Sequence, residues 1–309
     1  MPAMTITTPR PAVGVACVLG AAALWGTTGT SQALAGGTLP ALWFGALRLV
    51  FATAFFAAFA AATGALRPAA WRGLSARDAL GAGLCMAVYN LAFFAGVQLT
   101  GVAVGTAIAL GSGPIWAGLL QALVQRAPPS GRWWMGAGTA VAGGVLLSAG
   151  RPGGALALSL PGLLLCLLAG LSYATYTLLN RRMVAHAPAA VITLAAFGCA
   201  ALVALPVAAM QAGWPVPGPR DLAAAAYVGI VTAGVSYLLY SHALHHVQPA
   251  TGVTLALAEP VVAFVLAVTV LGEAAGLAAI AGLVLVVAGV LGVVKAELSS
   301  PGTRPAPSA

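Results

Sequence analysis

Ten apolar runs fill this sequence, and they restrict the fold more than any other feature does. Each run is about 20 residues long, the length that an α-helix needs to cross the hydrocarbon core of a bilayer. The breaks between the runs are short, and none can hold a folded loop domain. We expect membrane-spanning helices near residues 12–34, 39–62, 76–98, 101–124, 132–150, 158–180, 188–210, 220–243, 247–271 and 274–294.

The charged residues are too few for a water-soluble protein. They make up 6% of the 309 residues, whereas a soluble domain carries about 25%. The net charge of +8 comes from single or paired arginines between apolar runs, without the basic stripe of a nucleic-acid-binding protein. The four cysteines lie inside apolar runs, with no CxxC spacing. The composition predicts an all-α integral membrane protein in the cell membrane, surrounded by lipid, with no nucleic acid, metal or cofactor.

The basic residues are unevenly divided between alternate breaks. With the N-terminus in the cytoplasm, ten of them fall on the cytoplasmic side, and only Arg151 and Arg220 fall outside. This bias follows the positive-inside rule and predicts an even number of spans with both termini cytoplasmic. Residues 295–309 contain proline and serine, and we expect a disordered cytoplasmic tail there. The ten cytoplasmic bases are Arg10, Arg67, Arg72, Arg77, Arg126, Arg132, Arg181, Arg182, Lys295 and Arg304.

The two halves of the sequence repeat each other at an offset of 146 residues. Near the start of each half, Trp25 pairs with Tyr173, two residues out of phase with the rest. The halves, residues 12–150 and 158–294, each contain five spans, so the second half enters the membrane upside down relative to the first. Such a 5+5 inverted repeat of ten transmembrane helices is typical of secondary transporters, with a central site where the halves meet. The matched pairs are Gly83 and Gly229, Pro114 and Pro260, Gly136 and Gly282, and Gly143 and Gly289.

Five motifs carry a resemblance to a known family. They are LWGTTG (24–29), GALRLVFA (45–52), SYATYTLLNRR (172–182), YLLYSHAL (237–244) and LALAEPVVAFVLAVTVLGE (255–273). With these motifs, residues 12–294 resemble the EamA family of the drug/metabolite transporter superfamily. The resemblance implies a ten-helix inverted repeat that moves small metabolites, often by export, with amino acids and their relatives among the known substrates. One difference from the family lies at the end of the fourth span. The first half often has an acid there, as the second half has at the equivalent Glu273, whereas this sequence has Ala127.

Glu259 is the sharpest candidate for a transport residue. It lies at the middle of the span 247–271, where an ionised acid costs about 2.5–3.5 kcal/mol on insertion scales. Such an acid persists where it faces a cavity or a partner, and it suits a group that binds and releases a coupling proton. Pro260 removes a backbone hydrogen bond beside it and frees a carbonyl toward the same cavity. Alternatively, Glu259 is a static acid that pairs with another helix to fix packing.

Arg48 is the only base inside a span. It lies too deep to be a plain interface residue, although its stem can extend toward the interface. In a functional role, Arg48 holds a substrate carboxylate or pairs with Glu259. In a structural role, it bonds backbone carbonyls and locks its helix in place. Both roles offset the cost of a buried guanidinium.

Aromatic residues are the candidates for lining a substrate cavity. Trp25 and Tyr173 occupy repeat-related places in the first helix of each half. Together with other aromatic and hydroxyl side chains, they can stack on and hydrogen-bond a small organic substrate. Ordinary aromatic packing between helices explains each of them singly. The further members of this set are Thr27, Thr28, Tyr176, Tyr237 and Tyr240.

Two polar residues and two prolines inside the spans complete the candidates. Asn90, which follows Tyr89, and Ser112 are expected to face the cavity, although interhelical hydrogen bonds of about 0.6 kcal/mol explain them as well. Pro114 and Pro260 are the candidate helix breaks. Gln121 lies nearer a span end and is expected at the membrane interface.

Three histidines have a spacing that can place them on one helix face. His242, His245 and His246 lie at i, i+3 and i+4, and a metal site is one reading of that spacing. No acid or cysteine lies nearby in the sequence, so we favour interfacial histidines without a metal.

These features favour a secondary transporter that exports amino acids or related zwitterions by alternating access, driven by a proton or substrate gradient. The sequence lacks the G-x-x-x-x-G-K-[ST] motif of a primary pump. The alternative within transporters is efflux of drugs or lipophilic cations, which repeated buried acids would favour. A membrane-embedded enzyme would need clustered histidines or acids within the spans. The sequence indicates no oligomeric state.

Overall fold

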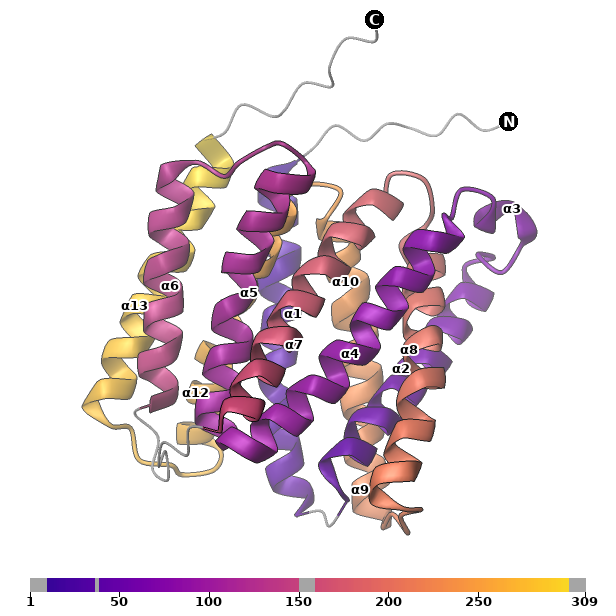
Figure 1. Cartoon of the computed structure of the whole chain (residues 1–309), viewed down its shortest axis with the longest axis horizontal. Coiled ribbons are helices and arrows are strands. Elements are labelled where there is room, and N and C mark those ends of the chain that lie inside the picture. Colours follow the sequence, from indigo (N-terminus) through magenta and orange to yellow (C-terminus); the bar gives the residue numbers. More distant parts are fainter. Residues whose placement is uncertain (1–9, 37–38, 150–158, 300–309) are drawn as a thin grey trace, which may run out of the picture.

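The computed structural model describes residues 10–36, 39–149 and 159–299, and all regular structure within these ranges is helical. The helices run up and down through one bundle (Figure 1). The first half contains α1 (Pro11–Ala35), α2 (Ala41–Ala62), α3 (Pro68–Trp71), α4 (Ala76–Thr100), α5 (Val102–Val124) and α6 (Gly131–Ala149). The second half contains α7 (Leu160–Met183), α8 (Ala189–Ala212), α9 (Pro219–Tyr227), the π-helical segment η1 (Val228–Val235), α10 (Ser236–Ala243), α11 (Pro249–Leu255), the 3₁₀ turn η2 (Ala256–Ala258), α12 (Glu259–Thr269) and α13 (Leu277–Ser299).

The bundle has the dimensions of a membrane protein. In the described part of the chain, nine helical spans are long and apolar enough to cross a bilayer. Two of them are composite: Pro219–Ala243 joins α9, η1 and α10, and Pro249–Thr269 joins α11, η2 and α12. The tenth is α6, whose 19 residues reach about 28 Å, but whose tryptophans, glycines and Arg132 make it less apolar. The all-α membrane fold is confirmed.

Apolar side chains cover the outside of the bundle. Leu202 is 77% exposed, Leu123 is 76% exposed and Leu277 is 84% exposed. Soluble monomers rarely expose contiguous apolar surface on this scale. The outer surface is therefore matched to lipid tails rather than to water.

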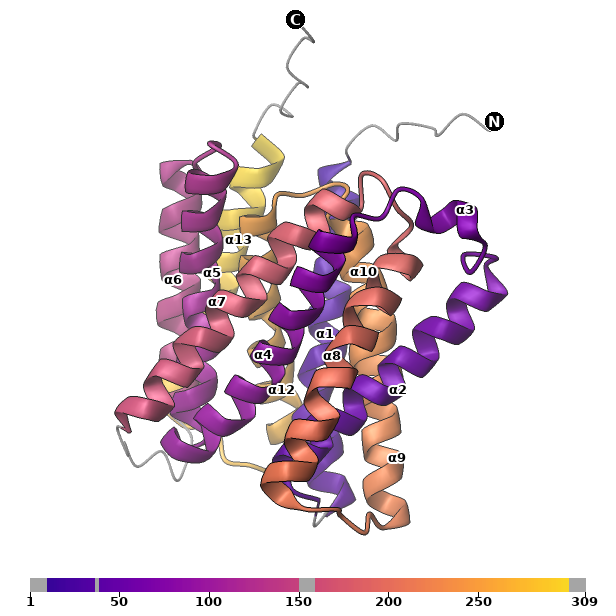
Figure 2. The ribbon, with the colours of Figure 1, turned by 45° about the vertical axis from the view of Figure 1, so that its right-hand side comes forward.

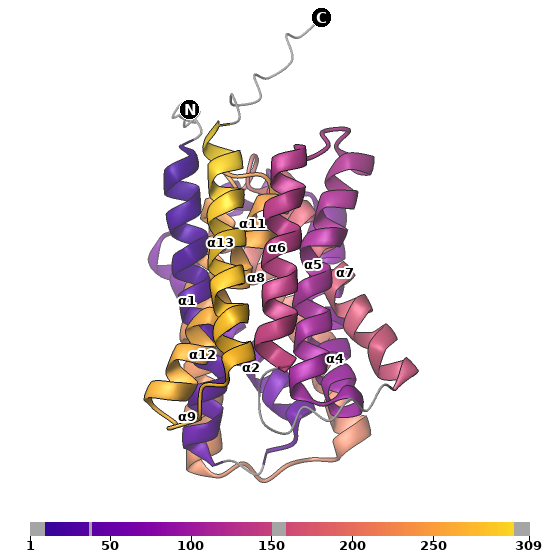
Figure 3. The same ribbon diagram turned by 90° about the vertical axis from the view of Figure 1, so that its left-hand side faces the viewer.

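The two ends of the bundle differ in charge. The described chain begins with α1 and ends with α13 at the same end (Figure 3). Nine of the bases predicted as cytoplasmic lie in the helix ends and connections of this base-rich end, whereas Arg220 lies at the opposite end, at the start of α9. Arg151 and Arg304 lie outside the described residues. The bases of the base-rich end are Arg10, Arg67, Arg72, Arg77, Arg126, Arg132, Arg181, Arg182 and Lys295.

Glycines bring α6 and α13 into backbone contact, side by side and antiparallel (Figure 3). A Cβ atom on Gly136 would lie 3.0 Å from the Gly289 carbonyl oxygen, and one on Gly289 would lie 2.6 Å from the Gly136 oxygen. Gly143 and Gly282 form the same reciprocal pair, at 2.8 and 2.7 Å. The repeat offset of 146 residues relates Gly136 to Gly282 and Gly143 to Gly289, so it turns one contact pair into the other. An inverted repeat requires this exchange, and the two-halved fold is confirmed.

A second pair of glycines shows the same exchange. A Cβ atom on Gly83 in α4 would lie 3.0 Å from the Ala196 carbonyl oxygen in α8. One on Gly229 in η1 would lie 2.9 Å from the Arg48 carbonyl oxygen in α2. In Figure 2, α2 lies beside α8 and α9, which continues into η1. The second half thus fixes the backbone of Arg48, a residue of the first half.

Local sequence signals set several helix boundaries. Ser75 Oγ accepts a hydrogen bond from the Asp78 backbone N–H at 3.2 Å where α4 begins. Ser159 Oγ does the same for the Gly162 N–H at 3.4 Å where α7 begins. Between α4 and α5 the chain turns at Gly101 alone, with φ of +81°, a conformation that favours glycine.

The C-terminal helix is longer than the sequence predicts. α13 continues to Ser299, so residues 295–299 are helical rather than part of the predicted tail. The reason is Glu297, which accepts hydrogen bonds from the Gln248 N–H at 3.2 Å and the Thr251 hydroxyl at 2.5 Å. Residues 300–309, the rest of the predicted tail, lie outside the described residues. The short helix α3, in the break between the second and third spans, was also not expected.

The two candidate helix breaks differ in their surroundings. α5 remains one α-helix although Pro114 lies inside it. Beside Pro260, by contrast, α11 ends at Leu255 and a 3₁₀ turn precedes α12. A proline removes one backbone donor, and packing against neighbouring helices decides whether the helix continues through it. The change of helix type places Glu259 in the first turn of α12.

Alanine at Gly143 or Gly282 is expected to destabilise the bundle. The added methyl group would lie 2.8 or 2.7 Å from a backbone oxygen of the facing helix, which forces α6 and α13 apart. Overpacking of this kind costs about 1–3 kcal/mol, so the melting temperature of the detergent-solubilised protein should fall. The matched control is Gly138→Ala, where a Cβ atom meets open space. An equal loss of stability in all three variants would contradict the proposed close contact.

Candidate functional site

A guanidinium–amide pair lies between α2 and α4. Arg48 Nη2 donates a hydrogen bond to Asn90 Oδ1 at 3.0 Å, and Asn90 is buried. Gly45, almost one turn before Arg48, makes room for the amide, because a Cβ atom there would lie 2.7 Å from Asn90 Nδ2. The missing side chain at Gly45 therefore lets Asn90 approach α2 and orient the guanidinium.

Within the described part of the chain, three buried N–H donors in this region have no acceptor. They are Arg48 Nε, Asn90 Nδ2 and Trp25 Nε1. A buried donor without an acceptor costs about 1–3 kcal/mol, and native proteins satisfy nearly all such groups with protein, water or ligand atoms. Two of the three belong to the Arg48–Asn90 pair. Adjacent donors of this kind suit the two oxygens of a carboxylate.

Glu259, in the second half, faces the same region. α1 packs closely against it, since a Cβ atom on Gly26 would lie 2.8 Å from the Glu259 carbonyl oxygen. The Glu259 carboxylate lies within electrostatic range of Arg48, Tyr89 and Tyr237. Among the residues that the structure describes, no ion pair within 4.0 Å joins Glu259 to Arg48. The acid and the base therefore share one region without neutralising each other by contact.

Aromatic rings from four helices form a wall beside this acid and base. The Trp25 ring centroid lies 5.1 Å from that of Tyr237, 5.4 Å from that of Tyr240 and 6.4 Å from that of Tyr173. All three pairs are edge-to-face, the geometry that aromatic quadrupoles prefer. Tyr173 makes further ring contacts with Tyr89 and Tyr176. We use "central site" for Trp25, Arg48, Tyr89, Asn90, Tyr173, Tyr176, Tyr237, Tyr240 and Glu259.

Ser112 is the candidate residue that the structure leaves outside the central site. Its hydroxyl donates to the Ala109 carbonyl of its own helix at 3.3 Å, and it packs against Gly170 of α7. Pro114 lies two residues after it, inside the same helix α5. The other candidates, Arg48, Asn90 and Glu259 with the four aromatic residues, come together.

Sequence reasoning missed a buried polar network between α7 and α10. Asn180 Nδ2 donates to the Tyr176 hydroxyl at 3.0 Å and to Ser241 Oγ at 2.8 Å. The hydroxyls of Thr177 and Tyr240 are 3.1 Å apart. Each of these side chains is fully buried. Asn180 lies one helical turn after Tyr176, and this spacing could have indicated that the two side chains share a helix face. The neighbouring Arg181 and Arg182 instead indicated that Asn180 lies at a helix end.

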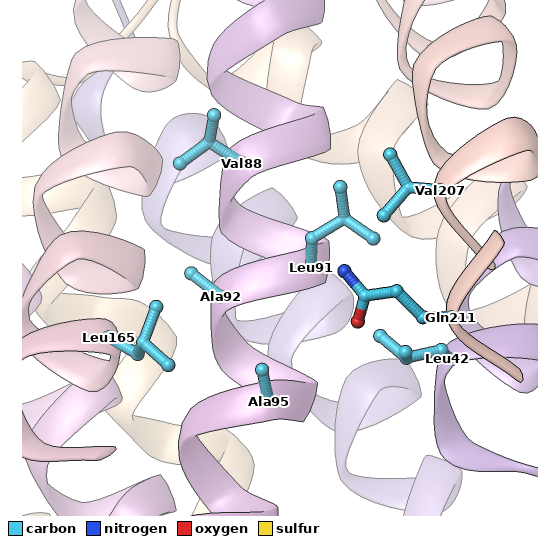
Figure 4. A pocket seen from close by; sticks show the side chains of 8 residues that line it. All are labelled: Leu42, Val88, Leu91, Ala92, Ala95, Leu165, Val207 and Gln211. Carbon is cyan, nitrogen blue, oxygen red and sulfur yellow. The ribbon is translucent and has the colours of Figure 1, made fainter. Parts of the chain in front are cut away.

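A cavity of about 260 Å³ lies elsewhere in the bundle. In Figure 4, Leu42, Leu91, Val207 and Gln211 approach one another from α2, α4 and α8. Gln211 and Val88 are exposed, so the cavity opens on the flank of the bundle. No residue of the central site lines it. The full lining is Leu42, Val88, Leu91, Ala92, Ala95, Leu165, Val207 and Gln211.

Comparisons with known proteins agree with this architecture. The sequence model of the EamA-like transporter family matches residues 12–149 and 160–295. A Bacillus subtilis (strain 168) protein named "Uncharacterized transporter YwfM" is 35% identical over 282 residues, which cover 89% of this chain and 91% of that protein. A solved structure described as "Crystal structure of protein" has a TM-score of 0.78 at 22% identity, covering 91% of this chain and 96% of the other. At that identity, the likeness to the solved structure concerns the fold alone.

The three histidines gather at the base-rich end, where α10 meets α11. Their ring centroids are 5.1 to 6.3 Å apart, and no group that could hold a metal is found among the described residues. Burial lowers the pKa of His245, and so do His242, His246 and Arg181. Burial, His242, Arg181 and Arg10 lower the pKa of His246. Both shifts oppose protonation of the folded protein.

Acidification is expected to destabilise the folded protein through His245 and His246. Their pKa is lower in the folded than in the unfolded state, so the unfolded state binds more protons as the pH falls through about 6.5. The melting temperature should therefore drop between pH 7.5 and pH 5.5. The double variant H245N/H246N should show a smaller drop in melting temperature than the parent protein. The control H186N, which changes an exposed histidine, should show the same drop as the parent. An unchanged pH dependence in the double variant would rule out this origin.

Proposed function

Because the chain belongs to the EamA-like transporter family, we propose that it exports amino acids or related zwitterions by alternating access. As a member of this family, within the drug/metabolite transporter superfamily, it is a multi-pass membrane transporter with a small-molecule substrate. The resemblance in its motifs is confirmed. Family membership leaves the substrate class open, and the central site supplies the argument for it.

The observation that carries the proposal is the Arg48–Asn90 pair with its two unpartnered donors. Arg48 Nε and Asn90 Nδ2 are buried inside the bundle and have no acceptor among the residues that the structure describes. A substrate carboxylate would accept from both of them and would offset the charge of the guanidinium. An arginine suits this role because its planar donors match the two oxygens of a carboxylate. The pair therefore favours substrates that carry a carboxylate.

Glu259 supplies the opposite charge. It lies within electrostatic range of Arg48 without an ion pair, so a substrate between the two can meet both. The ammonium group of an amino acid would then face the Glu259 carboxylate, and the aromatic wall would contact the apolar part. When no substrate is bound, a proton can neutralise the carboxylate. This exchange is our proposal for coupling export to a proton gradient.

The halves of the bundle provide the proposed motion. Residues 12–150 and 158–294 form the two repeats, and their glycine contacts keep bulky side chains out of the interface. Rocking of one set of helices against the other would expose the central site to alternate sides of the membrane. We propose that the base-rich end, with both termini, faces the cytoplasm of the cell.

Efflux of lipophilic cations is the second candidate function. Glu259 beside the rings of Tyr89 and Tyr237 favours it, since an acid and aromatic faces attract cations. Arg48 opposes it, because a guanidinium in the same region repels a cation that has no carboxylate. A transporter releases its substrate unchanged, so we propose no catalytic residue.

A metabolite screen tests the substrate class directly. Cells that overproduce the protein should accumulate specific amino acids outside and should tolerate toxic amino-acid analogues. Cells that overproduce the E259Q variant are the matched control. Increased tolerance to lipophilic cations, with no change in extracellular amino acids, would favour the second candidate instead.

Glu259→Gln is expected to abolish gradient-driven export while the protein stays folded. The amide keeps the size of the side chain but neither ionises nor releases a proton. Export should be measured over a range of pH, with the melting temperature as the check on folding. Glu273→Gln, which alters an exposed acid after α12, is the control and should export normally. Unchanged flux of E259Q at every pH would eliminate the proton role.

Arg48→Ala is expected to weaken export of carboxylate substrates by about tenfold to a hundredfold. The change removes charge-assisted hydrogen bonds, each of which contributes about 1.5–3 kcal/mol. Competition between an amino acid and its amide, which lacks the carboxylate, measures the selectivity. Arg72→Ala, at an exposed position next to α3, is the control. Equal losses for both substrates would assign Arg48 a structural role.

A further inference from the structure

The central site is sealed from the base-rich end by buried side chains. On this side, Tyr176 and Tyr240 of the central site belong to the network with Asn180, Ser241 and Thr177, and all five side chains are fully buried. Arg48 and Glu259 keep part of their surface exposed. Toward the opposite end, the hydroxyls of Tyr227 and Thr27 are 3.0 Å apart, at an exposed position. The structure is therefore closed at the base-rich end.

Above this network, the connection between α10 and α11 is held from three other helices. Arg181 of α7 donates a hydrogen bond from Nη1 to the Leu244 carbonyl. Gln121 of α5 accepts a hydrogen bond from the Ala250 N–H, at the start of α11, at 3.1 Å. Its amide nitrogen donates to the Ala127 carbonyl, in the connection that follows α5, at 3.1 Å. Gln121 is thus buried in an interhelical contact near the end of its span.

Glu297 of α13 makes the strongest set of contacts with this connection. Its two carboxylate oxygens accept separately, from the Gln248 N–H at 3.2 Å and from the Thr251 hydroxyl at 2.5 Å. Hydrogen bonds to an ionised carboxylate are stronger than those between neutral groups. Arg181 lies within electrostatic range of Glu297 and adds an opposite charge. One side chain therefore fixes the start of α11.

The same segment leads directly to the central site. Thr251 lies in α11, and the chain then passes through the 3₁₀ turn Ala256–Ala258 to Glu259. A stretch of 3₁₀ helix inside a longer helix commonly marks a hinge. Motion of α11 away from Glu297 would therefore pivot at the turn just before Glu259.

We propose that Glu297 is the latch of the gate at the base-rich end. Its carboxylate holds the α10–α11 connection against α13 while this end is closed, and the transport cycle breaks these two hydrogen bonds to open it. The inference rests on the alternating access proposed above and assigns this chain a gating residue at a distance from the substrate. Gln121 and Arg181 hold the same connection from α5 and α7.

A cysteine beneath the latch reports whether the end is open. Thr254 is fully buried in α11, and its hydroxyl donates to the Ala250 carbonyl of the same helix at 2.9 Å. The reporter is T254C in the full-length chain, with Cys17, Cys85, Cys166 and Cys199 replaced by alanine. A membrane-impermeant maleimide is applied separately to each side of sealed vesicles.

Glu297→Ala is expected to raise the rate of T254C labelling from the base-rich side by about tenfold or more. Thr251→Val, which removes one donor and leaves the carboxylate, should raise it less and guards against misfolding of the first variant. Asp78→Asn, an acid-to-amide change at the same end, should leave the rate unchanged. Melting temperature and gel-filtration profile check that each variant is folded.

Two results would overturn the latch. One is equally slow labelling in folded E297A, T251V and parent proteins. The other is rapid labelling of the parent from the base-rich side, because the end would then already be open. Labelling needs no substrate, so this test is separate from the export assays. Faster labelling of E297A together with an absence of metabolite export would reject the proposed substrates and retain the latch.

Discussion

Direct backbone contact at glycines is the interaction on which the rest of the structure depends. In a bilayer, apolar burial does not drive helices together, because lipid tails are as apolar as leucine, so close packing must do it. Gly229 brings η1 against the backbone of Arg48, and Gly26 brings α1 against Glu259. A larger side chain at Gly229 would push η1 away from the helix that carries the base, and one at Gly26 would push α1 away from the helix that carries the acid.

The scaffold is symmetric, but the chemistry placed on it is not. The repeat offset relates Glu259 to Gly113, and the reciprocal glycine contacts relate Arg48 to Ala196. Each half therefore contributes one charge that the other half lacks. A zwitterion is asymmetric in the same way, with one group of each sign, and a site between two unlike halves can bind it in a single orientation.

Departures from regular α-helix also concentrate in the second half. The π-helical segment η1 lies against the backbone of Arg48, and the 3₁₀ turn η2 lies just before Glu259. Their counterparts in the first half, α4 and α5, are regular throughout their described lengths. Irregular helix within a membrane is tolerated where neighbouring helices satisfy the backbone, and it commonly marks functional positions. The second half is thus the more specialised of the two.

The sequence by itself determined the spans, the repeat and the charge difference between the two ends, because hydrophobic length and basic residues respond to the bilayer wherever the chain packs. It also singled out Arg48 and Glu259, since a charge inside a span is costly at any rotation of its helix. Only the tertiary structure decided that Arg48 bonds to Asn90, that Ser112 stands apart, and that Glu297 holds the α10–α11 connection. Such contacts depend on how helices distant in sequence are rotated toward one another, and hydropathy carries no record of that rotation.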